Sequence, residues 1–158
     1  PDFALDPETG YPNDIGLVYV EEAMDISGNG FAATIPMADA DADFSAADCI
    51  ITGWGLTSTA PIQLPDILQE ADVTEVGNED CLNTWGSGVQ DFHICVTGEQ
   101  ERGACSGDSG GPLVCLVGGN YVVAGATSWG EATCNTNFPS VYSRVSFYRD
   151  WINEVSGL

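Results

Sequence analysis

The sequence contains no lysine, three arginines and one histidine, against 24 aspartate and glutamate residues in a chain of 158. The resulting formal net charge of −21 repels nucleic acid and anionic lipid surfaces, so we expect neither class of partner. Solubility and protease resistance in an extracellular fluid are the simpler explanation of this acidity. The alternative, long-range attraction of basic substrates, is limited because salt screens it within about 10 Å.

Long hydrophobic runs are also missing, and no stretch approaches the roughly 20 apolar residues of a membrane span. The chain does not begin with a charged and then apolar signal pattern, so we expect a soluble, already processed polypeptide. It has no Asn-x-Ser/Thr sequence, which argues against N-glycosylation, and no Cys-x-x-Cys pair, which argues against zinc and thioredoxin-type sites.

One acidic segment, Asp39-Ala-Asp-Ala-Asp43, has the alternation of a calcium loop. A calcium loop needs glycine at its sixth position and glutamate at its twelfth, where this chain has Phe44 and Ile50. We therefore expect a solvated acidic loop rather than a calcium site, and we expect no metal or organic cofactor.

The composition that is present favours an all-β fold. The chain has 44% hydrophobic residues, 19 glycines and 8 prolines, and its short β-branched runs are separated by turn residues. An apolar run at Ile15–Val20 and six later runs are predicted to be strands, and Ser146–Val155 is predicted to be a helix with Ser146 as its N-cap. The six later strands, enough to close a small barrel, are expected at Cys49–Gly53, Leu68–Val76, Phe92–Val96, Pro112–Val117, Tyr121–Ser128 and Ser140–Val145.

The most specific signal is the run Gly107-Asp-Ser-Gly-Gly-Pro112. Glycine at 107 permits a backbone turn that directs its own amide and that of Ser109 at one point. Two such amides would stabilise the negative oxygen of a tetrahedral intermediate. Glycines after the serine allow the chain to pass tightly behind it. The run therefore indicates a nucleophilic serine beside an oxyanion hole.

This run, together with Asn13–Val18, Thr52–Gly55 and Ser128–Gly130, resembles the chymotrypsin family of serine endopeptidases. The resemblance implies a double β-barrel, of which this chain supplies the complete C-terminal barrel, part of the N-terminal barrel and a C-terminal helix. The implied boundaries are a remnant of the first barrel with the crossover at 1–36, the second barrel at 37–145 and the helix at 146–158.

Family roles follow residue by residue. Ser109 resembles the nucleophile, Asp14 the carboxylate that orients the catalytic histidine, and Gly107 with Ser109 the oxyanion-hole amides. Asp108 resembles the activation-pocket carboxylate that pairs with a new N-terminal ammonium. The even number of cysteines suits an oxidising compartment. The implied disulfides are Cys49–Cys115, Cys81–Cys95 and Cys105–Cys134.

The general base is missing from this pattern. His93, the only histidine, stands before Cys95 on a predicted strand, whereas the family's catalytic histidine lies well upstream of the Asp14 motif. Ile15–Val20 would moreover be a lone barrel strand, and Asp108 would be buried without its ammonium. We therefore expect a separate N-terminal light chain, produced by cleavage before Pro1 and held without a disulfide, that carries the catalytic histidine and the activating N-terminus.

The resemblance also implies a substrate pocket. Its base would be Gly103, which is small and uncharged, so a strict demand for lysine or arginine is disfavoured. The small residues leave room for a bulky apolar or aromatic side chain, although Glu131 at the rim leaves a broader preference open. The implied pocket residues are Gly103, Ala104, Ser106, Ser128, Trp129, Gly130, Glu131 and Ser140.

Longer stretches resemble the acidic fibrinolytic proteases of earthworms, the lumbrokinase group. They are Leu64–Gln69, His93–Cys95, Phe138–Tyr142 and Ser143–Ser146. We expect the heavy chain of a secreted two-chain serine endopeptidase, made as a zymogen, present in digestive or coelomic fluid and able to cleave fibrin. Two alternatives remain: an inactive homologue that acts as a binding or regulatory module, and an inactive proteolytic remnant.

Overall fold

The structure is a computed structural model that describes residues 2–6, 8–27 and 30–157. Pro1, at which the expected cleavage falls, lies outside these residues. Six strands close an antiparallel barrel in the order β1-β4-β5-β8-β7-β6, and β1 pairs with β6 to complete the ring. The barrel strands are β1 (Cys49–Gly53), β4 (Gln69–Val76), β5 (His93–Gly98), β6 (Pro112–Val117), β7 (Asn120–Trp129) and β8 (Ser140–Arg144).

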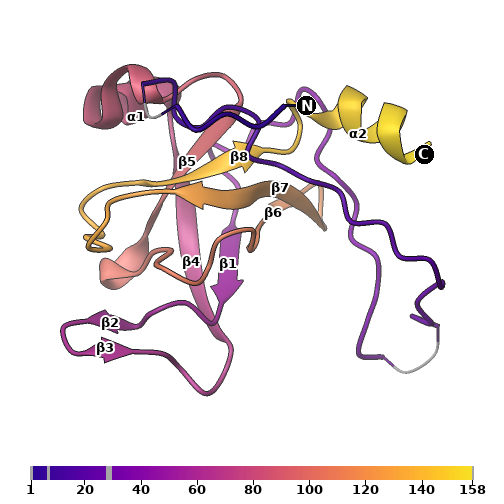
Figure 1. Cartoon of the computed structure of the whole chain (residues 1–158), viewed down its shortest axis with the longest axis horizontal. Coiled ribbons are helices and arrows are strands. Elements are labelled where there is room, and N and C mark those ends of the chain that lie inside the picture. The colour runs from indigo at the N-terminus through magenta and orange to yellow at the C-terminus, as the bar shows by residue number, and fades with distance from the viewer. Residues whose placement is uncertain (1, 7, 28–29, 158) are drawn as a thin grey trace.

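Five shorter elements and a terminal helix surround the barrel (Figure 1). A two-stranded hairpin projects from one end, and helix α1 lies before β5 at the other. These elements are β2 (Ser58–Thr59), β3 (Ile62–Gln63), α1 (Asn78–Trp85), the 3-10 helices η1 (Gly86–Gly88) and η2 (Glu99–Glu101), and α2 (Arg149–Ser156). The all-β class with a closed barrel and a C-terminal helix is confirmed.

The core fills the inside of the barrel because alternate residues of each strand point inward. In β4, for example, Ala71 and Val73 are buried whereas their neighbours are exposed. Phe44, Ile94, Leu113 and further apolar side chains complete this core. The core positions the loops at the barrel ends, from which the candidate site is built.

The disulfides have the three pairings implied by the family resemblance. Cys49–Cys115 joins directly opposed residues of β1 and β6, where the barrel closes. Cys81–Cys95 fastens α1 to β5, and Cys105–Cys134 joins the loop before β6 to the loop after β7. Each such bond typically stabilises a small domain by about 2–4 kcal/mol.

Apart from strand ends that differ by one or two residues, two sequence predictions differ from the structure. Residues 15–20, predicted as a strand, form none, because the described residues supply no neighbouring strand for their backbone; Val18 and Tyr19 are 90% and 88% exposed. The C-terminal helix begins at Arg149 with Tyr148 as N-cap, not at Ser146. Tight turns that bond Phe147 and Tyr148 to the carbonyls of Arg144 and Val145 come first.

The N-terminal segment lies along one end of the barrel beside α2, and the chain then loops away from the barrel before returning at Met37 (Figure 1). Ile15 packs against the cluster of Val145, Tyr148 and Ile152, which holds α2 on the barrel. In the described part of the chain, no helix has the length and apolarity needed to cross a bilayer.

Candidate active site

Ser109 lies on the exposed loop between η2 and β6. The loop is held by its own backbone and by β7. The Asp108 amide donates to the Cys105 carbonyl (3.0 Å), the Gly111 amide to the Asp108 carbonyl (2.8 Å), and the Gly110 amide to Thr127 of β7 (2.8 Å). These bonds fix the serine on a tight turn anchored to the barrel.

Two glycines of this loop have a left-handed backbone conformation. Gly107 has φ +104° and Gly110 has φ +77°, a region that residues with a side chain rarely adopt. Within the described residues, the amides of Gly107 and Ser109 donate to no acceptor, in contrast to those of Asp108, Gly110 and Gly111. Two amide donors therefore remain available next to the serine hydroxyl.

Asp108 turns its carboxylate away from the loop and towards the Thr52–Gly55 run. One oxygen accepts from the Gly55 amide at 2.8 Å and the other from the Cys105 amide at 2.9 Å. A β-carbon added at Gly53 or Gly55 would lie 1.9 Å or 2.3 Å from this carboxylate. Both positions must be glycine for Asp108 to lie there.

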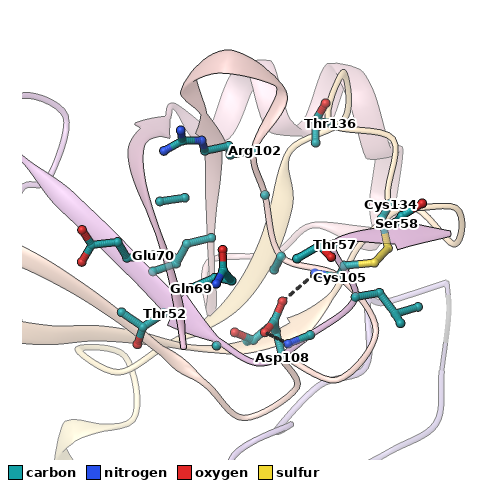
Figure 2. A pocket seen from close by; sticks show the side chains of 18 of the residues that line it. Thr52, Thr57, Ser58, Gln69, Glu70, Arg102, Cys105, Asp108, Cys134 and Thr136 are labelled. Carbon is teal, nitrogen blue, oxygen red and sulfur yellow. Dashed lines mark hydrogen bonds between the residues drawn. A yellow bond between two sulfur atoms is a disulfide. The ribbon is translucent and has the colours of Figure 1, made fainter. Parts of the chain in front are cut away.

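The Asp108 carboxylate lines a cavity of about 820 Å³. Figure 2 shows Asp108 and Arg102 at opposite ends of this cavity, with the Cys105–Cys134 disulfide in one wall. Segments 57–60 and 68–71 line it as well. A smaller groove of about 220 Å³, lined by Trp54, Leu68 and others, lies beside Ser109.

Part of the expected substrate pocket is brought together. A β-carbon at Gly103 would lie 3.5 Å from the Ser140 hydroxyl, and one at Gly130 would lie 3.9 Å from the Ser140 α-carbon. Gly103 and Ala104 line the large cavity, whereas Ser140 and Gly130 do not. Small residues from three segments thus meet at one point.

The other four expected pocket residues do not line the large cavity. Ser106 is exposed, and its carbonyl accepts from the Leu56 amide (2.9 Å). Ser128 donates its hydroxyl to Asp14, and the Trp129 indole packs edge-on against Trp85. None of these three residues, nor Glu131, lines the large cavity.

Glu131 closes its own loop with its carboxylate. One oxygen accepts from the Thr133 hydroxyl, from the Thr133 amide at 2.8 Å and from the Asn135 amide at 3.0 Å. The bond from the Thr133 hydroxyl, followed by the amide bonds, holds the pKa of this carboxyl below its usual value. The negative charge of Glu131 therefore stabilises the turn at 131–135.

Asp14 is half-buried and is bonded to β7. Its Oδ2 accepts from the Ser128 hydroxyl at 2.6 Å, and its carbonyl accepts from the Ser143 hydroxyl at 2.7 Å. Just before it, the Asn13 amide donates to the Tyr148 hydroxyl at 3.1 Å. Ser128 of β7 thus bonds the carboxylate itself, whereas Ser143 of β8 and Tyr148, the N-cap of α2, hold the backbone of Asp14 and Asn13.

The Ser109 loop and Asp14 are anchored to adjacent residues of one strand. Gly110, next to Ser109, bonds Thr127, and Asp14 bonds Ser128. The two segments lie about a hundred residues apart in sequence, yet both are anchored to neighbouring residues near the end of β7.

His93 is fully buried and both its ring nitrogens are occupied. Nδ1 accepts from the Gln90 amide at 3.1 Å, and Nε2 lies 2.8 Å from the Gly10 carbonyl, to which it donates. Burial, only partly offset by the Gly10 carbonyl and the charge of Asp14, lowers the pKa of the imidazole below its ordinary value. His93 is therefore a structural histidine.

Several residues at the site carry no motif in the sequence. The cavity residues Gln69, Glu70 and Arg102 belong to ordinary polar stretches, and only their position at the barrel end brings them together. In the part of the chain that the structure describes, no group of three or more potential ligand side chains is placed to bind a metal ion.

Comparisons with known proteins agree with this geometry. A family model described as Trypsin matches residues 4–152. The chain is 41% identical over 155 residues to the fibrinolytic enzyme, isozyme C, of Lumbricus rubellus, an alignment that covers 92% of this chain and 63% of that protein. It is 46% identical over 111 residues to chymotrypsin-like elastase family member 1 of Felis catus, covering 68% of this chain and 41% of that protein. The chain thus spans about three fifths of the first relative and two fifths of the second.

Proposed function

Because this chain belongs to the trypsin family, we propose that it carries the nucleophile and the orienting carboxylate of a serine endopeptidase. The family membership and the earthworm relative confirm the resemblance that the sequence motifs predicted. The observation that carries the proposal is the anchoring of the Ser109 loop and of Asp14 to Thr127 and Ser128, neighbours on β7.

In the proposed reaction, the Ser109 hydroxyl attacks the peptide carbonyl while the catalytic imidazole takes its proton; the imidazolium then protonates the leaving amine, the C–N bond breaks, and an acyl-enzyme remains. The amides of Gly107 and Ser109, which donate to nothing in the described structure, stabilise the oxyanion. Asp14 holds the catalytic imidazole in the tautomer that accepts the serine proton, while Ser128 holds Asp14. Water then hydrolyses the acyl-enzyme by the reverse sequence.

The catalytic imidazole comes from outside these 158 residues, since His93 is buried with both nitrogens engaged. We propose that it lies on an N-terminal light chain held without a disulfide. The ammonium of a new N-terminus on that chain would enter the large cavity and pair with Asp108, replacing the contact with the Gly55 amide. Activation of a zymogen would then consist in forming this pair.

For the substrate, we propose cleavage after apolar or aromatic residues. Gly103, Gly130 and Ser140 leave space without a carboxylate, and the Glu131 charge is already satisfied by its own turn. Hydrolysis of fibrin is proposed because the Lumbricus rubellus relative is named a fibrinolytic enzyme. Secretion is proposed because all six cysteines form disulfides, which persist in oxidising compartments.

Hydrolysis of short chromogenic peptides with phenylalanine, leucine, glycine or arginine at the cleaved position tests this proposal. The substrate is given to the purified full-length protein, whose chains are identified by intact mass and N-terminal sequencing. We expect the apolar peptides to be cleaved fastest, Ser109→Ala to abolish cleavage, and Asp14→Asn to lower kcat by about 10⁴-fold. A correctly folded wild-type protein no more active than Ser109→Ala would contradict the proposal and favour a binding module.

A further inference from the structure

The Gly10 carbonyl receives two side-chain N–H groups from the barrel. His93 Nε2 of β5 lies 2.8 Å from it, and Trp129 Nε1 of β7 lies 3.1 Å from it. The Gln90 amide donates to His93 Nδ1, so the proton of the neutral ring must be on Nε2, directed at Gly10. A buried imidazole and an indole therefore hold one backbone oxygen.

The held segment has an unusual backbone. Gly10, Tyr11 and Asn13 have φ of +70°, +56° and +61°, and residues other than glycine rarely adopt such angles. A β-carbon at Gly10 would lie 1.7 Å from the Gly88 carbonyl oxygen and 2.7 Å from His93 Cε1. Such a conformation persists only where surrounding contacts impose it.

The segment ends at Asp14, whose carboxylate bonds Ser128, the residue before Trp129. Its position is thus fixed at the Gly10 end by His93 and Trp129, and at the Asp14 end by Ser128 and Ser143. No element of regular structure lies between these two anchors. Without the hydrogen bonds to the Gly10 carbonyl, the backbone that carries Asp14 would relax from these positive φ angles towards more favourable ones.

We propose that His93 is a positioning residue for Asp14: its Nε2–H, with the Trp129 indole, holds the Gly10–Asp14 segment in the conformation that places the carboxylate. The inference rests on the proposed function. It predicts that the hydrogen bond to Gly10, rather than the volume of the imidazole, is what catalysis requires. A misplacement of about 1 Å in such a group lowers a rate by about 10²-fold.

Replacing His93 by glutamine or by asparagine distinguishes the hydrogen bond made by Nε2 from the one made by Nδ1. The side-chain amide of His93→Gln reaches the position of Nε2 and can donate to Gly10, whereas that of His93→Asn reaches only the position of Nδ1. In the full-length protein, we expect His93→Gln to keep kcat within about threefold of wild type. We expect His93→Asn to lose about 10-fold to 100-fold in kcat with KM changed less than about twofold. Equal losses in both variants, or no loss in His93→Asn, would overturn the inference.

Amide hydrogen exchange gives a readout that needs no activity. The amides of Tyr11 and Asn13 are hydrogen-bonded, to the Asp6 carbonyl and the Tyr148 hydroxyl, so they report on the segment. We expect faster exchange at residues 10–14 in His93→Asn but not in His93→Gln. An inactive wild-type protein would contradict the proposed function. Equal exchange rates at residues 10–14 in the two variants would, separately, overturn the His93 inference.

A second variant covers the case in which His93→Asn does not fold. Trp129→Phe removes the other donor to Gly10 and keeps an aromatic ring against Trp85 and Tyr11. Faster exchange at residues 10–14 in Trp129→Phe is expected. Unchanged exchange there would show that the donors to the Gly10 carbonyl do not hold the segment.

Discussion

At the scale of single residues, two glycines determine where the Asp108 carboxylate lies. Gly53 and Gly55 leave the space that its oxygens occupy, and the Gly55 amide donates to one of them. The Thr52–Gly55 run was recognised in the sequence as a family motif, but its contact with Asp108 was not. This contact could not be predicted from sequence, because Gly55 and Asp108 are far apart in the chain and only the pairing of β1 with β6 brings them together.

Substitution of Gly55 by alanine should destabilise the protein. The added β-carbon would lie 2.3 Å from Asp108 Oδ2, so the carboxylate must leave its two amide donors. The expected loss in free energy of unfolding is about 1–3 kcal/mol, measured by urea denaturation. Gly77→Ala is the matched control, since no atom lies within 4 Å of its added carbon. An equal effect in both variants would contradict this account of Asp108.

His93 should make the stability depend on pH. Burial lowers the pKa of the folded-state imidazole from the ordinary value of 6.5. As the pH falls through this range, the imidazole is therefore protonated in the unfolded chain before it is protonated in the folded chain. The free energy of unfolding should therefore fall as the pH drops below about 6.5 towards the folded-state pKa. The charged groups nearby are Asp14, which opposes the shift, and Arg144, which donates to the His93 carbonyl and pairs with Glu75.

The control for this dependence is His93→Gln, which cannot titrate. The difference in stability between wild type and variant should change between pH 7 and pH 5, whereas the carboxylates titrate in both proteins. A difference that stays constant over this range would show that His93 does not resist protonation in the folded protein. Urea denaturation at each pH measures it.

At the scale of elements, the barrel strands were predictable and their surroundings were not. β1 and β6 begin and end where the sequence predicted, because turn residues bound short apolar runs. Helix α1 was not predicted, since it buries only Cys81 and so lacks an apolar face. Its position depends on the Cys81–Cys95 disulfide and on the contact of Trp85 with Trp129.

Helix α2 also supports the candidate site, because its N-cap residue Tyr148 accepts from the Asn13 amide. The helix is held by Ile152, which is 6% exposed and packs with Val145 and Tyr148. We expect Ile152→Ala to lower the free energy of unfolding by about 2–4 kcal/mol, measured by denaturation. The control Val155→Ala, on the exposed side of the same helix, should change it by less than about 0.5 kcal/mol. Similar losses in both variants would show that α2 is not anchored through Ile152.

At the scale of the whole molecule, the two proposed catalytic side chains come from distant parts of the sequence. Asp14 comes from the N-terminal segment and Ser109 from the barrel, and both are fixed at the end of β7. The motifs predicted these two residues separately. Their anchoring to neighbouring residues of β7 follows from the closed barrel, which no local pattern encodes. The predicted strand at 15–20 fails for the same reason, since an apolar run forms a strand only beside another strand.

Covalent labelling by a serine-directed fluorophosphonate tests the central claim most directly. The reagent is added to the purified full-length protein, and the modified residue is identified by peptide mass. It should modify one residue, Ser109, in the native protein and none after denaturation. Asp14→Asn should be modified much more slowly, because in the proposed mechanism Asp14 orients the imidazole that takes the serine proton. A natively folded wild-type protein that takes up no label at Ser109, under conditions that label a control serine protease, would contradict the account.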